Sequence, residues 1–381
     1  MSLAACLLTA ASLLASAAPG AQDPPRGIVI DALPVSEDPS QSYALYLPSD
    51  YAPDRTWSLL LAFHPSARGR ALVDKYRAAA ERYGYIVAGS NNSRNGSWQE
   101  TIRAVRAMSG DVGRRFAVDA QRVYLTGHSG GARVAMEVAL GPNDIAGVIA
   151  SSAGFPDARP RTSVKFPVFA TVGLEDFNYL EMVRLDERLT SAHYLAVFDG
   201  GHEVPPDAVA IEAVEWLELQ AMRSGRRARD PALVESLFAS RTERLRVGSD
   251  LPAQLRLLRA TVADFAGLRD TTDLQTAVDA LAKNPQLKSA RARERSELEA
   301  EARVLDEAMQ SEARLRDPPA RGAALARLRT LFESWSRAAT GSDPSPERAR
   351  ARRLLGAVAA GATERVTDAE YRALVQQYRR R

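Results

Sequence analysis

The sequence predicts an α/β fold: a doubly wound, mostly parallel sheet of about eight strands, followed by an all-α C-terminal region. Between Arg26 and Met222, short continuous apolar runs alternate with amphipathic stretches. Unbroken apolar runs are typical of strands that are buried on both faces of a parallel sheet. Beyond Pro231 the β-branched runs disappear, and Ala, Leu, Arg and Glu dominate.

Each expected strand is a short run rich in apolar residues. The runs lie at 27–30, 42–47, 58–63, 85–88, 122–126, 145–150, 168–172 and 194–198. The amphipathic stretches expected as helices between them lie at 70–83, 98–116, 130–140, 178–190 and 206–222. Strands that alternate with helical patterns indicate βαβ units. We therefore place a catalytic α/β domain at 26–222, a linker at 223–231 and an Arg-rich all-α domain of roughly four to six helices at 232–381.

Residues 1–21 have the pattern of a secretory signal peptide, because an uncharged run of small residues and leucines breaks at Pro19 and Gly20. We expect cleavage between Ala17 and Ala21. We expect the mature protein to be secreted or periplasmic, with an uncleaved helical anchor as the alternative. The only cysteine, Cys6, would leave with this peptide, so the mature chain would have no disulfide. Cys6 also resembles a lipoprotein processing site, but it stands too close to the start for a lipid anchor to be favoured.

The segment 127–131 reads Gly-His-Ser-Gly-Gly between an expected strand and an expected helix. This is the G-x-S-x-G nucleophile elbow in the context that it requires. A serine at such a turn projects its hydroxyl above the sheet, and the glycines allow the backbone segments on either side of it to approach each other. We expect Ser129 to be the nucleophile, with the N–H of Gly130 and the positive end of the following helix facing the developing oxyanion.

The chain offers four histidines as the base that Ser129 needs. His202 lies in a Gly-Gly-His loop directly after the last expected strand, and it is the preferred base. His128 should point away from the hydroxyl, and His193 begins a strand. His64 ends the strand before the loop that is expected to supply the first oxyanion donor.

The acid should orient the imidazole and stabilise its charged form. Asp176 follows the strand that precedes the histidine strand, and it is the preferred acid. Its neighbour Glu175 is the competitor.

Over roughly residues 40–222 the chain resembles the α/β-hydrolase superfamily, and within it the esterases related to feruloyl esterases and polyhydroxybutyrate depolymerases. In this superfamily the triad follows the order serine, acid, histidine, which Ser129, Asp176 and His202 match. The resemblance implies two-step acyl transfer that needs no cofactor and no metal. The implied substrate is a small-molecule or polymeric ester.

The first oxyanion donor usually follows a His-Gly pair, but here His64 is followed by a proline, which has no N–H. We expect Ser66 to be the donor, with Ala67 as the second choice. A polar loop that ends at Trp98 lies at the same edge of the sheet, where ligands bind in open α/β folds. Its Asn91, Asn92 and Trp98 are either pocket residues or parts of an ordinary helix-start loop.

Charge divides unevenly along the chain. Residues 1–220 hold 19 Lys+Arg and 25 Asp+Glu, whereas residues 221–381 hold 31 and 22. The C-terminal runs mix both signs, which favours solvated helices with local ion pairs. Contact with a protein or an anionic surface is the alternative, and nucleic acid is not expected.

Three functions remain open from the sequence. An esterase that forms an acyl-enzyme on Ser129 is the first. A serine peptidase acting on short peptides would use the same triad. A non-catalytic binding or scaffold protein on a hydrolase fold is the third, although all three triad members are present in order.

Overall fold

The computed structural model describes residues 24–142, 144–157, 159, 161–246, 250–341 and 345–379. The expected signal peptide at 1–21, with Cys6, lies outside the described residues. The strands are β1 (Val29–Pro34), β2 (Ser42–Tyr46), β3 (Trp57–Phe63), β4 (Tyr85–Ser90), β5 (Val118–His128), β6 (Gly147–Ser151), β7 (Val168–Gly173) and β8 (His193–Phe198). Each of them overlaps one of the eight expected runs.

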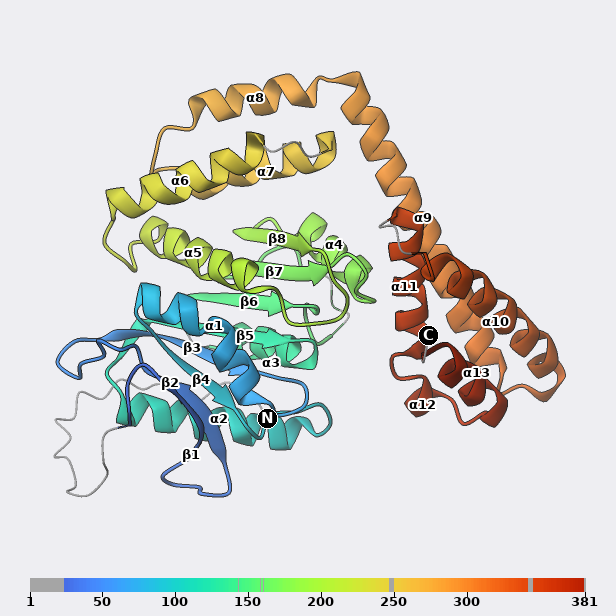
Figure 1. Ribbon diagram of the computed structural model, residues 1–381, viewed down its shortest axis with the longest axis horizontal. Helices are drawn as coiled ribbons and strands as arrows, with labels where there is room; N and C mark the ends of the chain where they lie inside the picture. Colours follow the sequence, from blue (N-terminus) through green and yellow to red (C-terminus); the bar gives the residue numbers. More distant parts are fainter. Residues whose placement is uncertain are drawn as a thin grey trace.

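The eight strands form one sheet in the order β1-β2-β4-β3-β5-β6-β7-β8 (Figure 1). β2 pairs antiparallel with both β1 and β4, and all other neighbours are parallel. The helices among and after the strands are α1 (Gly69–Tyr83), α2 (Trp98–Arg115), α3 (Gly130–Leu140), α4 (Tyr179–Arg188) and α5 (Asp207–Arg223). The expected fold class, a doubly wound and mostly parallel sheet of eight strands followed by helices, is confirmed.

The sheet is buried on both faces, which explains the continuous apolar runs. One face packs against α2, α3 and α4, as in the cluster that includes Met108, Met136 and Met182. The other face packs against α1 and α5, with Tyr76 and Trp216 almost fully buried. Two helical layers therefore hold the strands in place, and the loops at their carboxyl ends can carry chemistry.

The C-terminal region contains α6 (Pro231–Arg246), α7 (Leu251–Phe265), α8 (Thr272–Ala282), α9 (Pro285–Arg314), α10 (Pro318–Ala339), α11 (Pro346–Ala359), α12 (Ala362–Arg365) and α13 (Ala369–Arg379). These are eight helices in the described part of the region, more than the four to six expected. Among the described residues, no helix combines the length and the apolar character needed to cross a bilayer.

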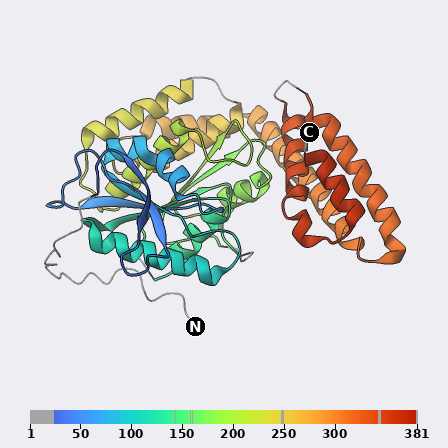
Figure 2. The same ribbon diagram turned by 60° about the horizontal axis from the view of Figure 1, so that its bottom comes forward.

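Residues 232–381 do not pack as one unit. α6, α7 and α8 lie outside α5 (Figure 1), and the outer face of α5 joins α6 and α7 in a small apolar cluster that includes Leu219, Leu237 and Phe265. α10 to α13 form a separate core with the end of α9, and Figure 2 shows this group of helices beside the sheet rather than on it. The 30-residue α9 connects the two groups. We call α10–α13 the C-terminal bundle.

Candidate active site

Three side chains from separate loops form a continuous hydrogen-bonded relay. Nε2 of His202 lies 2.9 Å from Oγ of Ser129, and Nδ1 of the same ring lies 2.8 Å from Oδ1 of Asp176. The three residues follow β5, β7 and β8, which end at the same edge of the sheet. The structure thus brings together the three residues that the sequence proposes as nucleophile, base and acid.

The turn at Ser129 has the backbone that a nucleophile elbow requires. Ser129 has φ 53° and ψ −122°, an unfavourable combination for a residue with a side chain. A Cβ on Gly127 would lie 2.2 Å from the carbonyl carbon of Gly131, and a Cβ on Gly131 would lie 1.9 Å from the oxygen of Phe63. Both glycines are therefore needed so that β5 can turn sharply into α3 beside β3.

The loop that carries the acid, residues 174–179, is fastened to the loop that carries the base. We call it the acid loop. The N–H of Leu174 donates to the carbonyl of Phe198, and the N–H of Glu175 donates to the carbonyl of Gly200, each at 2.9 Å. A side chain at Gly173 would be 2.4 Å from the carbonyl of Gly200. These contacts set the distance between the carboxylate and the imidazole.

Asp176 is fully buried, and its Oδ1 also accepts a hydrogen bond from the N–H of Asn178 at 2.8 Å. Its Oδ2 is buried without a hydrogen-bond partner among the described residues. Glu175, the competing acid of the sequence analysis, points elsewhere, because its carboxylate accepts hydrogen bonds from Arg348 and Arg352 of α11. Of the two acidic residues, Asp176 is the one in contact with the imidazole.

The imidazole of His202 lies close to two other rings. The Phe177 ring stacks on it with centroids 4.0 Å apart and planes 28° apart, and the His128 ring lies 4.9 Å away. Sequence reasoning gave neither residue a role. His128 was expected to point away from the hydroxyl, and the structure places it against the base. The contact of Phe177 arises from the fold of the acid loop, and no sequence signal indicates it.

The remaining histidines are poorly suited to act as the base. Burial is the main cause that lowers the pKa of His128 to about 3 and that of His64 to about 4, so both rings are neutral near pH 7. His193 begins β8, at the end of the strand far from His202, and its Nε2 lies 3.5 Å from Asp186. Among the histidines, His202 alone is hydrogen-bonded to both Ser129 and Asp176.

The two oxyanion donors expected from the sequence differ in their surroundings. Gly130 is the first residue of α3, so its N–H has no intrahelical acceptor. The N–H of Ser66, by contrast, donates to Nδ1 of His64, and that of Ala67 donates to the carbonyl of His64, each at 3.1 Å. In this conformation both expected donor N–H groups are already bonded to His64. The role of Ser66 therefore stays a prediction, and it requires that the His64 ring move away from the Ser66 N–H.

The polar loop before α2 divides into a structural half and an exposed half. The amide nitrogen of Asn91 donates to the carbonyl of Asp31, and Oδ1 of Asn92 accepts from the N–H of Ser42. Both side chains thus fasten the loop to β1 and β2, which is a structural explanation for the two amides that the sequence proposed for the pocket. Trp98 remains 44% exposed at the start of α2.

Asn95, which the sequence analysis did not single out, is the residue of this loop that lies against Gly130, the expected oxyanion donor. A Cβ added to Gly130 would lie 1.7 Å from its Oδ1. The N–H of Asn95 donates to the carbonyl of Pro65 at 2.8 Å, which joins this loop to the oxyanion loop. The only feature of the sequence that could have indicated Asn95 is its position in a polar loop after a parallel strand.

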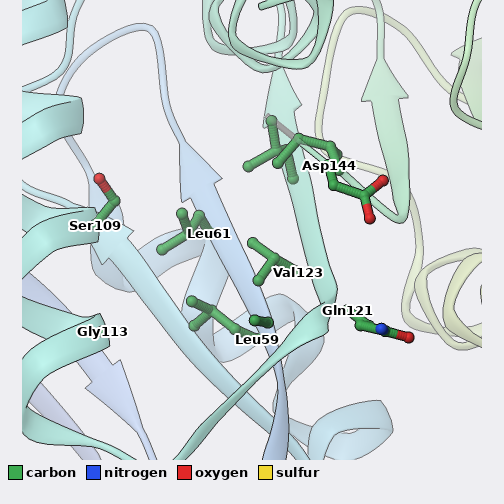
Figure 3. Close-up of a pocket in the computed structure, with 10 residues that line it drawn as sticks. Leu59, Leu61, Ser109, Gly113, Gln121, Val123 and Asp144 are labelled. Atoms are coloured by element: carbon green, nitrogen blue, oxygen red, sulfur yellow. The ribbon is translucent and has the colours of Figure 1, made fainter. Parts of the chain in front are cut away.

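A cavity of about 250 Å³ lies elsewhere in the α/β part of the chain (Figure 3). Leu59, Leu61 and Val123 line it from the sheet, Ser109 lines it from α2, and Asp144 lies at its side before β6. None of the three relay residues lines this cavity. Among the described residues, no group of three or more His, Cys, Asp and Glu side chains is placed to hold a metal ion.

No protein-family model matches the chain, and no curated protein matches it. Solved structures do match part of it. It is similar to esterase B from Lactobacillus rhamnosis in a tributyrin phosphonate complex, at 15% identity and a TM-score of 0.43, over 54% of this chain and 90% of that chain. It is also similar to an esterase from Pyrobaculum calidifontis, at 14% identity and a TM-score of 0.39, over 52% and 85%. An S-formylglutathione hydrolase from Agrobacterium tumefaciens matches at 17% identity and a TM-score of 0.37, over 48% and 90%.

Proposed function

We propose that this protein is a serine hydrolase that cleaves carboxylic esters through an acyl-enzyme on Ser129. The observation that carries the proposal is the relay in which His202 contacts Ser129 at 2.9 Å and Asp176 at 2.8 Å. Distances in this range allow direct proton transfer between the hydroxyl and the imidazole. The strained elbow supports the proposal, since strained serines at such turns are typical of nucleophiles.

In the proposed reaction, His202 removes the hydroxyl proton as Oγ of Ser129 attacks the ester carbonyl. Asp176 accepts a hydrogen bond from the Nδ1–H group of His202 and stabilises the imidazolium that forms. The N–H of Gly130 and the amino end of α3 face the negative oxygen of the tetrahedral intermediate. The imidazolium then gives its proton to the leaving alcohol. In the second half, water attacks the acyl group with His202 again acting as the base, and Ser129 is released.

Ester cleavage is preferred to peptide cleavage because an alcohol departs from the tetrahedral intermediate more easily than an amine. The same relay serves a peptidase, so short-peptide cleavage stays the second candidate. The resemblance of 40–222 to feruloyl esterases and polyhydroxybutyrate depolymerases makes aromatic and short hydroxyacyl esters the first substrates to test. Secretion stays a prediction that rests on the apolar run at 1–21.

The experiment is labelling with a fluorophosphonate, followed by hydrolysis assays on p-nitrophenyl esters, feruloyl esters and peptide amides. The wild-type protein should be labelled and should cleave esters. Ser129→Ala should not be labelled, and its ester kcat should fall by about 10⁴-fold or more, because the nucleophile is lost. Ser163→Ala, which changes an exposed serine before β7, is the matched control.

Equal labelling of the wild-type protein and Ser129→Ala would remove the proposed function and favour the binding or scaffold alternative. Faster cleavage of peptide amides than of esters would favour the peptidase. The Ser163→Ala control should behave as the wild type in both assays.

A further inference from the structure

Helix α11 of the C-terminal bundle contacts the acid loop, although the two are far apart in sequence (Figure 1). Glu175, the residue next to Asp176, accepts a hydrogen bond at 3.0 Å from Nη2 of Arg348 and one at 2.6 Å from Nη1 of Arg352. The side chains of Glu175 and Arg348 are only 16% and 15% exposed. Each carboxylate oxygen of Glu175 is thus held by a different arginine of one helix.

A third arginine of α11 holds both ends of the acid loop. Nη1 of Arg353 donates to the carbonyl of Leu174 at 2.7 Å, and its guanidinium lies 4.5 Å from the centre of the Tyr179 ring. The same guanidinium pairs with Glu301 of α9, whose side chain is 3% exposed. Because the Arg353 side chain is only 11% exposed and is paired, it has little freedom to move and is well suited to fix the loop.

α11 also reaches the base through one aromatic ring. A Cβ added to Gly356 would lie 3.1 Å from Cβ of Phe177, so the helix backbone lies directly against this side chain. The Phe177 ring itself stacks on His202 with centroids 4.0 Å apart. The contacts therefore run without a break from α11 to Phe177 and from Phe177 to the imidazole.

We propose that α11 positions the triad: Arg348, Arg352 and Arg353 hold the acid loop, and Gly356 holds Phe177 against His202. This inference rests on the proposed hydrolase function. It makes the C-terminal bundle part of the catalytic apparatus, with the arginines as positioning residues that do not touch substrate. Two backbone bonds, from Leu174 and Glu175, connect the acid loop to the loop of His202, and the arginines of α11 add side-chain contacts to the acid loop.

The first test compares ester hydrolysis by full-length variants. In Arg348→Ala/Arg352→Ala and in Glu175→Gln, kcat should fall by about tenfold while KM stays within about twofold, because a small misplacement of the relay slows chemistry more than binding. In a chain that keeps Arg348, Arg352→Ala should lower kcat, and Arg352→Lys should lower kcat less than Arg352→Ala does. Gly356→Val, which pushes on Phe177 without changing charge, should lower kcat in the same way.

The matched control is Arg327→Ala. It removes an ion pair with Glu307 inside the helical region, 2.6 Å long and half exposed, that does not involve the acid loop. Its kcat should equal that of the wild type.

The second test does not depend on activity. Hydrogen exchange of a peptide covering 174–179 should be faster in Arg348→Ala/Arg352→Ala than in the wild type, with the β5 peptide unchanged, and Arg327→Ala should show no difference. If wild-type protein shows no labelling and no hydrolysis, the proposed function fails, and exchange alone decides whether α11 fixes the loop. In active protein, an unchanged kcat, or a change in KM alone, would overturn the positioning role, as would unchanged exchange.

Discussion

At the scale of single residues, His128 is a buried imidazole with two other imidazoles nearby. Its ring lies 4.9 Å from His202 and 6.2 Å from His64, and its Nδ1 is buried without a hydrogen-bond partner among the described residues. A cation at this position would be desolvated and would also repel a protonated His202. Burial and the two neighbouring imidazoles together explain why the pKa of His128 falls to about 3.

His128 should make the folded protein less stable in weak acid. Below about pH 6.5 an unfolded histidine takes up a proton, whereas folded His128 does so only near pH 3, so acid favours the unfolded state. Between pH 7 and pH 5 this difference lowers the free energy of unfolding by about 2 kcal/mol. Urea unfolding of the wild type should therefore give a lower free energy of unfolding at pH 5 than at pH 7. In His128→Gln this decrease should be about 2 kcal/mol smaller.

His64→Gln should act in the same direction, because the pKa of His64 is also lowered, to about 4. If the wild type and His128→Gln lost equal stability between pH 7 and pH 5, His128 would not be the neutral, buried group described above.

At the scale of elements, α5 is both a cover for the sheet and the base on which α6 and α7 pack. The buried Asp264 of α7 accepts hydrogen bonds from the indole of Trp216 at 2.8 Å and from Gln220 at 3.2 Å, both on α5. It also pairs with Arg241 of α6 at 3.3 Å. Burial raises the pKa of Asp264 to about 6, which shows that three donors only partly offset the loss of solvation. One carboxylate thus connects three helices.

Removal of Arg241 should destabilise this junction strongly. The side chains of Arg241 and Asp264 are 7% and 5% exposed, so Arg241→Ala leaves a buried carboxylate without its cation. We expect the free energy of unfolding at pH 7 to fall by about 3 kcal/mol, as measured in urea. Arg246→Ala removes a pair on the same helix whose arginine is 79% exposed, and it should cost less than about 0.5 kcal/mol.

Equal effects of the two substitutions would show that the Asp264 junction contributes no more than a surface pair. Arg241→Ala should also lower the free energy of unfolding less at pH 5 than at pH 7. The raised pKa of Asp264 means that its carboxyl takes up a proton at pH 5 in the folded state.

At the scale of the whole molecule, the hydrophobic cores are separate. The two faces of the sheet form the larger cores, whereas the C-terminal bundle has its own core around Phe332, which is 1% exposed and contacts the rings of Trp335 and Tyr371. Chains with separate cores often unfold in parts rather than in one transition. Under the positioning proposal, the contacts of α11 with the acid loop are the place where local stability of the bundle would affect the site.

Phe332→Ala should therefore destabilise one part of the molecule. Truncation of a buried phenylalanine costs about 3–5 kcal/mol where the cavity cannot collapse. Hydrogen exchange should become faster in α10 and α13, whereas the peptides of β3 and β5 should keep their protection. Equal loss of protection in β5 would mean that the bundle and the sheet unfold as a single unit.

The sequence predicted the sheet well, because strands buried on both faces leave long apolar runs that are easy to recognise. The positions of Ser129, Asp176 and His202 could also be predicted, since each follows a strand at the same edge. The rings around His202 could not, because Phe177 and His128 meet it only after the loops fold. The division of 232–381 was missed as well. An amphipathic helix shows that it has a buried face, but its sequence does not show which partner covers that face.

Glu175 shows the same limit at one position. In the sequence it was a second choice for the acid, and its partners lie 173 and 177 residues away along the chain. No local pattern indicates contacts at that distance.

Those separations also bear on the order in which the chain folds. Contacts between distant segments form late, because a long loop must close before they are made. α11 ends at residue 359, so its contacts with the acid loop can form only after synthesis has passed this helix. Under the positioning proposal, an unfinished or C-terminally shortened chain would hold a complete set of triad residues and yet hydrolyse slowly. Full activity would then show that synthesis has passed α11.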